Sequence, residues 1–188
     1  LTIIAKIFSG PGDEILYSEY GFLMYPIAAE LAGSKGIKVK DISYRNSLTN
    51  FSKAITKKTK IIFIANPNNP TGTYVDKNEL NKFIKNLPKK ILLVIDAAYA
   101  EYVIKKDYSP GDDLVKNNNN VIMTRTFSKI YGLAGLRIGW AYCSKYIVDI
   151  FNRTRLPFNV NKVATEAAGV AIKDKNFFAK SVKHNNHY

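Results

Sequence analysis

The chain has 188 residues, of which 46% are hydrophobic and 23% are charged. These proportions are typical of a globular domain and exclude a disordered tail, a fibrous repeat and a disulfide scaffold. No run of about 18 apolar residues predicts a membrane span. The single cysteine, Cys143, favours a reducing compartment, so we expect a cytoplasmic protein. The first residues hold neither an initiator Met nor an export signal, and we interpret the sequence as a piece of a longer chain.

The formal net charge is +13, from 28 basic and 15 acidic residues. This charge favours one alternative, a nucleic-acid-binding module without enzymatic activity, whose affinity would depend strongly on salt. The lysines are scattered, however, and the densest cluster, Lys57-Lys58-Thr59-Lys60, contains no aromatic residue. We therefore expect a solvated surface, with neither nucleic acid nor a membrane as a partner.

Hydrophobic periodicity predicts that helices and strands alternate along the chain. Helices are predicted for residues 3–8, 22–31, 48–55 and 77–87, and from about 163 to the end. Strands are predicted for residues 15–17, 37–42, 61–65, 91–95, 121–124 and 137–143. Continuous apolar strands between helices are typical of a mostly parallel sheet covered on both faces, so we expect a three-layer α/β/α fold.

Polar residues follow three of the buried strands. They are Asn69 after the first, Asp96 and Tyr99 after the second, and Thr126, Ser128 and Lys129 after the third. Each alone could be a turn residue, a helix cap, a packing aromatic or a surface charge. Parallel strands bind ligands beyond their carboxyl ends, however. The combination therefore predicts that an amide, a carboxylate, a phenol and an amine meet in one crevice.

Four ordered motifs carry a resemblance to a known family. They are Asn69-Pro70-Thr71-Gly72, Asp96-Ala97-Ala98-Tyr99, Thr126-Phe127-Ser128-Lys129 and Arg137. Together they resemble the class I/II aminotransferases of fold type I, which use pyridoxal 5'-phosphate. The resemblance covers nearly the whole chain, and it implies that this chain forms the large domain of such an enzyme.

The resemblance implies catalytic roles for Lys129, Asp96 and Tyr99. Lys129 would form the Schiff base with the cofactor and later move a proton, which burial and nearby positive charge would assist. Asp96 would pair with the pyridinium nitrogen and keep the ring an electron sink. Tyr99, with Asn69, would donate to the phenolic oxygen of the ring.

The same resemblance implies a grip on the cofactor phosphate and a stacking residue. Thr126, Ser128 and Arg137 would hold the phosphate, since hydroxyls and a guanidinium are strong donors to it. Phe22 would stack on the ring face. Tyr20 and Tyr25 lie close by in the sequence and leave this last assignment open, as does a core role for Phe22.

The segment Gly132-Leu133-Ala134-Gly135-Leu136-Arg137-Ile138-Gly139 resembles the histidinol-phosphate aminotransferase branch. That branch exchanges the amino group between L-histidinol phosphate and 2-oxoglutarate, giving glutamate, in L-histidine biosynthesis. Relatives that act on aromatic amino acids or decarboxylate threonine phosphate are the alternatives, as is a non-catalytic remnant.

The resemblance also implies how the chain is organised. Residues 1–165 would form an N-terminally truncated cofactor-binding large domain, and residues 166–188 would begin the helical link to a small C-terminal domain. The substrate-binding arginine and a partner-subunit tyrosine would lie outside this chain, so the piece alone would have low activity. The full-length enzyme would be a homodimer. His184 and His187 lack metal-ligand spacing, and we expect no metal site.

Overall fold

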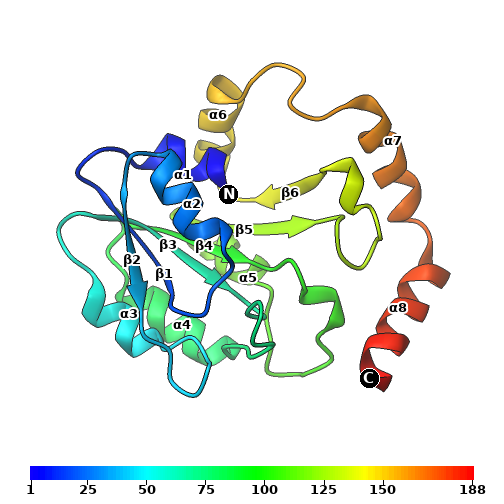
Figure 1. Cartoon of the computed structure of the whole chain (residues 1–188), viewed down its shortest axis with the longest axis horizontal. Coiled ribbons are helices and arrows are strands. Elements are labelled where there is room, and N and C mark those ends of the chain that lie inside the picture. Colours follow the sequence, from blue (N-terminus) through cyan, green and yellow to red (C-terminus); the bar gives the residue numbers. More distant parts are fainter.

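The computed structural model describes residues 1–188 and contains one six-stranded sheet. Its strands are β1 (Glu14–Ser18), β2 (Lys35–Val39), β3 (Thr59–Ala65), β4 (Leu92–Asp96), β5 (Val121–Thr126) and β6 (Gly139–Tyr142). They are ordered β2-β1-β3-β4-β5-β6 (Figure 1), and only β6 is antiparallel to its neighbour. The expected mostly parallel sheet is confirmed.

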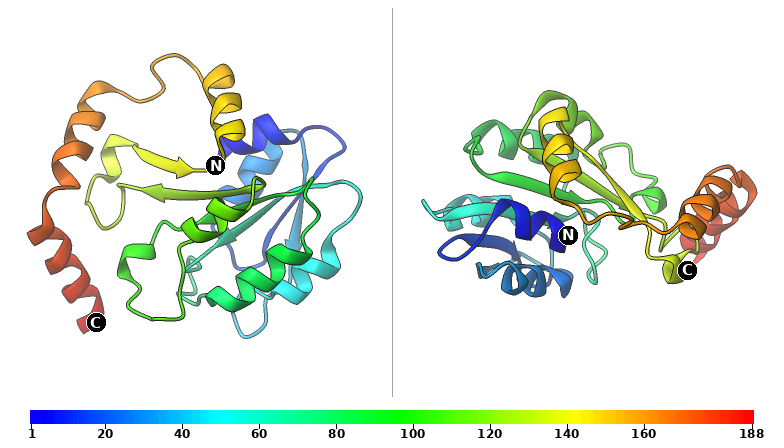
Figure 2. Two further views of the ribbon diagram at one scale, coloured as in Figure 1. Left: turned by 180° about the vertical axis from the view of Figure 1, so that it is seen from behind. Right: turned by 90° about the horizontal axis from the view of Figure 1, so that it is seen from above.

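Helices cover both faces of this sheet. They are α1 (Thr2–Phe8), α2 (Met24–Leu31), α3 (Leu48–Ala54), α4 (Lys77–Asn86), α5 (Asp112–Asn117), α6 (Lys145–Thr154), α7 (Lys162–Ala171) and α8 (Lys175–His187), with short 3-10 helices η1 (Ala100–Tyr102) and η2 (Ala134–Leu136). Side chains of α1, α2 and α6 pack in one apolar cluster, and those of α3, α4 and α5 in the other. The three-layer α/β/α fold is therefore confirmed. Helices α7 and α8 lie at one side of the molecule (Figure 2).

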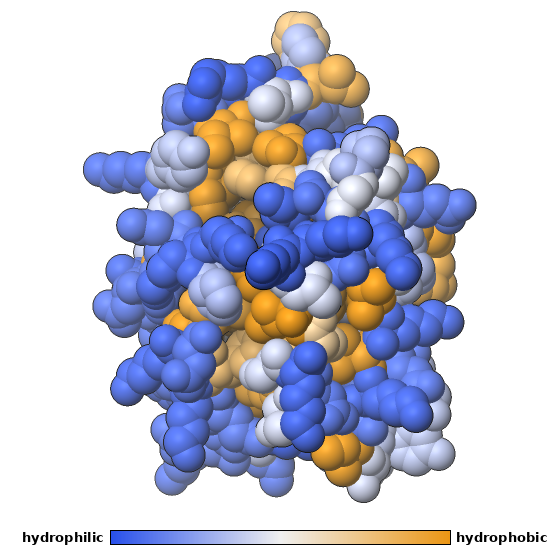
Figure 3. Space-filling model, turned by 90° about the vertical axis from the view of Figure 1, so that its left-hand side faces the viewer, coloured by the Kyte–Doolittle hydropathy of each residue, from blue (hydrophilic) through white to orange (hydrophobic).

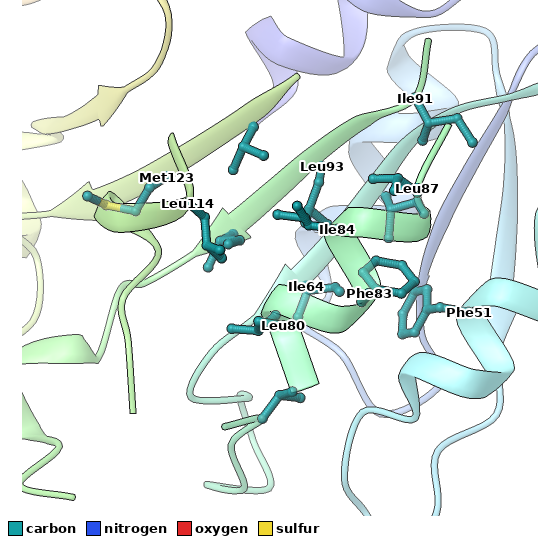
Figure 4. Packing of buried hydrophobic residues seen from close by; sticks show 14 of the residues in the cluster. Phe51, Ile64, Leu80, Phe83, Ile84, Leu87, Ile91, Leu93, Leu114 and Met123 are labelled. Carbon is teal, nitrogen blue, oxygen red and sulfur yellow. The ribbon is translucent and has the colours of Figure 1, made fainter. Parts of the chain in front are cut away.

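The two cores result from the alternation of side chains along the central strand β3. Ile62 and Ile64 point into the cluster beneath α3 and α4, which Figure 4 shows, and Ile61 and Phe63 point into the opposite cluster. All four are fully buried. A strand with apolar residues on both faces must be covered on both sides, and this places β3 at the centre of the sheet.

Some predicted boundaries are wrong. Helix α2 begins at Met24 rather than at residue 22, because Gly21 N–H donates to Ser18 O and forms a turn first. Strand β2 covers Lys35–Val39 rather than residues 37–42, because Ile42 pairs with Arg45 in an isolated antiparallel bridge. Helices α5 and α6 were not expected. Ser144 begins α6, and its hydroxyl accepts a hydrogen bond from Ile147 N–H at 3.5 Å.

The surface beside β2 and α3 is largely hydrophilic, with smaller apolar areas between the charged side chains (Figure 3). Lys35 and Lys38 of β2 are exposed, as are Lys57 and Lys58 of the basic cluster. These four lysines are solvated, as expected from the sequence. None of the helices is long and apolar enough to cross a membrane.

Replacing Ile62 with Ala tests the central position of β3. Ile62 is 0% exposed, so the change should lower the free energy of unfolding by about 2–5 kcal/mol through lost burial and a cavity. Urea denaturation measures this loss. The matched control, Ile104→Ala, removes the same atoms from a residue that is 68% exposed, and should change stability by less than about 1 kcal/mol. Equal losses in the two variants would contradict this position.

Candidate active site

The register of three parallel strands brings the polar strand ends together. Ala65 at the end of β3 pairs with Asp96 at the end of β4, and Asp96 pairs with Thr124 of β5. The segments that follow the three strands therefore leave the sheet along one edge, as expected.

A small pocket opens at this edge. Its lining residues come from α2 and the segment before it, from the ends of β3 and β4, and from the segments that follow β3, β4 and β5. They are Phe22, Tyr25, Ala65, Pro67, Asn69, Asp96, Ala98, Tyr99 and Lys129. Five residues predicted from the sequence are thus gathered around one cavity: Phe22, Asn69, Asp96, Tyr99 and Lys129. The pocket has a carboxylate, a phenol, an amide and an amine on its wall, which is the combination that the strand ends predict.

Asp96 is a buried carboxylate, only 9% exposed. It accepts hydrogen bonds from the Tyr25 hydroxyl at 3.0 Å and from Thr124 Oγ1 at 3.4 Å, and no lysine or arginine forms a salt bridge with it. Burial raises the pKa of Asp96, and the hydrogen bond from Tyr25 opposes that rise. A buried acid without a cationic side chain beside it is suited to a cationic ligand group.

The sequence names Tyr25 only as an alternative to Phe22 for stacking, and it does not identify Tyr25 as a hydrogen-bond donor to Asp96. Burial, and then the charge of Asp96, raise the pKa of Tyr25 well above the usual range, so its hydroxyl stays a donor. Its ring stacks on Phe63 with centroids 5.1 Å apart. In the sequence Tyr25 is an ordinary apolar position of a helix, and no local signal connects it with an acid 71 residues away.

Aromatic side chains form one wall of the pocket. Phe22 meets Tyr25 edge to face, with centroids 6.0 Å apart. Tyr20, the third aromatic of this segment, does not line the pocket and packs instead against Tyr44 at 5.2 Å. Phe22 is therefore an aromatic side chain at the position where a planar ring could stack.

Asn69, Tyr99 and Lys129 lie together at the mouth of the pocket. Asn69 Nδ2 donates to the Tyr99 hydroxyl at 3.4 Å, and Lys129 Nζ lies 5.1 Å from the centroid of the Tyr99 ring. Lys129 is exposed, so the burial expected for its amine is not found in this chain. The Tyr99 ring lies on one side of the amine, and solvent reaches the remainder.

The three remaining candidates form a cluster beside the pocket and do not line it. Thr126 Oγ1 accepts a hydrogen bond from Ser128 N–H at 3.0 Å, and the Arg137 guanidinium lies 3.5 Å from Ser128 Oγ. Arg137 also donates to Ala134 O at 2.6 Å. A Cβ at Gly139 would come within 2.6 Å of Arg125 O, so glycine allows β6 to lie close to β5 here.

The loop that carries Asn69 is fixed by a neighbouring asparagine, which the sequence did not single out. Asn66 Nδ2 donates to Val75 O at 3.1 Å, and Val75 N–H donates to Asn66 Oδ1 at 2.8 Å. The Tyr108 hydroxyl donates to Asn66 O at 2.7 Å. These bonds close the loop from both ends and hold Asn69 at the rim of the pocket.

The donor set fits pyridoxal phosphate. The buried carboxylate of Asp96, which has no salt bridge, is suited to a protonated ring nitrogen, and the aromatic wall with Phe22 to a planar ring. The Lys129 amine stands at the mouth, and the hydroxyls with Arg137 offer donors to a phosphate. The acid and the amine line one pocket, and the hydroxyls with Arg137 lie outside its lining.

Known proteins match the chain along its whole length. The family model "Aminotransferase class I and II" matches residues 1–188. The chain is 50% identical to a histidinol-phosphate aminotransferase of Pelagibacter ubique and 47% identical to one of Paramagnetospirillum magneticum, over 98% and 100% of its length. A crystal structure of histidinol-phosphate aminotransferase from Sinorhizobium meliloti in complex with pyridoxal-5'-phosphate superimposes with a TM-score of 0.91 at 27% identity, over 96% of this chain and 49% of that one.

The chain spans about half the length of the curated relatives it matches, 51% and 52% for these two. The family model, in contrast, matches every residue of this chain. The chain belongs to the aminotransferase class I and II family.

Proposed function

We propose that this chain forms the pyridoxal-phosphate-binding part of a histidinol-phosphate aminotransferase. The observation that carries the proposal is the single pocket lined by the buried acid Asp96 and the amine Lys129. The names of the relatives at 45–50% identity support the choice of this branch. The reaction would move the amino group between L-histidinol phosphate and 2-oxoglutarate, with imidazole-acetol phosphate and glutamate as the products.

Each group around the pocket would have one binding task. Asp96 would accept a hydrogen bond from the protonated ring nitrogen, and Phe22 would cover a ring face. Asn69 and Tyr99 would donate to the ring oxygen. Thr126, Ser128 and Arg137 would bind the phosphate, the arginine through its planar fork. When bound, the cofactor supplies an electron sink for the electron pair released at the substrate carbon.

Lys129 would handle the proton. Its Nζ is the one amine that lines the pocket, and a neutral amine can take a proton from the substrate carbon and return it at another atom. The Tyr99 ring, 5.1 Å from Nζ, holds the ammonium form by a cation–π contact and limits where it can move. Proton transfer needs this placement, because donor and acceptor must come within hydrogen-bond reach.

The organisation of the enzyme is part of the proposal. Residues 1–165 would be the large domain and residues 166–188, which include the end of α7 and all of α8, the start of the link to a small domain. We propose a homodimer in the cytoplasm that uses small-molecule substrates. The substrate arginine and the partner's tyrosine would come from other parts of the enzyme.

Replacing Lys129 with Ala should abolish turnover in the complete protein, because the pocket then has no amine to move the proton. We expect kcat to fall by at least about a thousandfold. Glutamate formation from 2-oxoglutarate is measured with histidinol phosphate and, in parallel, with phenylalanine as donor. Lys57→Ala, at an exposed lysine away from the pocket, is the control and should keep full activity. Normal turnover in Lys129→Ala would refute the role, and a preference for phenylalanine would refute the substrate.

Replacing Tyr25 with Phe keeps the packed ring and removes the hydroxyl that donates to Asp96. That donor favours the ionised carboxylate, so its loss should raise the pKa of Asp96 beyond the rise that burial causes. The acid limb of the pH profile of kcat/KM should move to higher pH, with near-normal activity at alkaline pH. The folded protein loses stability as pH rises from the unfolded-state pKa of Asp96 through its higher folded-state pKa, because the buried acid must then ionise. This loss of stability should be larger in Tyr25→Phe than in the wild-type protein.

The control for this variant is Tyr17→Phe, because Tyr17 is also buried in the same apolar cluster but does not contact Asp96. Infrared measurement of the protonated carboxyl against pH, in protein without cofactor, gives a readout that is independent of turnover. If the two variants have the same pH profile, Tyr25 has only a packing role.

A further inference from the structure

A buried ion pair lies next to the pocket without lining it. Arg125 Nη2 lies 2.8 Å from Glu101 Oε1, and Arg125 Nε donates to the same oxygen at 3.3 Å. The side chains of Arg125 and Glu101 are 16% and 6% exposed, against at least 28% for every other residue in a salt bridge of this chain. Two charges withdrawn from water this far need each other, because either one alone would be an unpaired buried charge.

The pair joins the two segments that carry the amine and the phenol of the pocket. Glu101 lies in η1, two residues after Tyr99, and Arg125 lies in β5, four residues before Lys129. The last backbone hydrogen bond between the segments is from Ala97 N–H to Thr124 O, at 2.9 Å. Beyond this bond, the Glu101–Arg125 pair provides the hydrogen bond and the salt bridge between residues 98–103 and residues 125–133, and no others connect them.

The arginine of the pair has a second neighbour, whereas the carboxylate has only the arginine. Arg125 pairs across the antiparallel β5–β6 ladder with Trp140, and its guanidinium lies 5.8 Å from the centroid of the Trp140 ring. Glu101 Oε2 is buried and has no hydrogen-bond partner. The carboxylate therefore depends on the guanidinium to compensate its charge, and the guanidinium also has a cation–π contact with the indole ring.

We propose that the Glu101–Arg125 pair is a positioning device that sets the distance between the Tyr99 side chain and Lys129 Nζ. This inference rests on the proposed function, since it assigns to the pair the task of placing the amine that moves the proton. Where donor and acceptor must meet within hydrogen-bond reach, a displacement of about 1 Å can cost about a hundredfold in rate. Neither Glu101 nor Arg125 touches the reacting atoms in this arrangement.

The test compares single and double substitutions in the complete protein. Glu101→Gln removes the negative charge and leaves Arg125 unpaired. Arg125→Lys keeps the positive charge but loses the planar guanidinium that contacts Glu101 through two nitrogens. The double variant Glu101→Gln/Arg125→Gln leaves no unpaired buried charge, so stability should largely return. The control is Glu79→Gln, which breaks the Arg45–Glu79 pair between the Arg45 loop and α4, and neither residue lines the pocket.

Three quantities are measured: kcat and KM, the thermal midpoint Tm, and amide hydrogen exchange in the protein without cofactor. Each single variant should lower kcat by about tenfold to a hundredfold with KM changed less than about twofold, since placement and not binding is lost. Exchange should rise in residues 98–103 and 126–133 but not in β3. In the double variant Tm should recover while kcat stays low.

A pair that only stabilises the fold would behave differently. Then kcat would recover together with Tm in the double variant, or exchange would rise throughout the sheet, and either result would overturn the proposal. Wild-type kcat in the control supports a local effect. If the wild-type protein has no aminotransferase activity, the proposed function fails, and the exchange of the two segments still decides whether the pair holds them together.

Discussion

The register of the parallel strands is the constraint on which the site depends. Asp96 is opposite Ala65 on one side and Thr124 on the other, so three strand ends coincide at one edge. Side chains alternate along β4: Val94 points into the cluster with α2, and Ile95 into the cluster with α4. A slip of one residue would turn Asp96 away from α2 and break its contact with Tyr25. The apolar residues of the strands therefore place the carboxylate, although they take no part in the chemistry.

Burial of Asp96 without a cationic side chain is costly, and the surrounding groups offset only part of that cost. Tyr25 donates one hydrogen bond and Thr124 a longer one, while the raised pKa shows that desolvation prevails. A carboxylate held in this condition gains most from a ligand that brings its own positive charge. The protein would therefore become more stable when a protonated ring nitrogen binds, which couples cofactor binding to folding.

The sequence predicts those parts of the site that follow strands. Asp96 comes directly after an apolar run, Asn69 and Lys129 follow theirs after a few residues, and parallel topology brings such positions together. Contacts made by side chains across long separations leave no local pattern, so the donation from Tyr25 to Asp96 and the pairing of Glu101 with Arg125 could not be foreseen. Helix α5 was missed because it is short. It has only six residues, too few for a period of 3.6 to be recognised.

The two ends of the pocket differ in how firmly this chain fixes them. Asp96 stands at the end of a fully buried strand, where packing and backbone pairing leave little freedom. Lys129 is exposed on a loop that follows β5, and its position depends on the Tyr99 ring and on the ion pair behind it. The acid end is thus set by the core of the sheet, and the amine end by side chains at its edge. Substitutions in the core should therefore change stability first, whereas substitutions at Glu101 or Arg125 should reach the chemistry through the placement of a single amine.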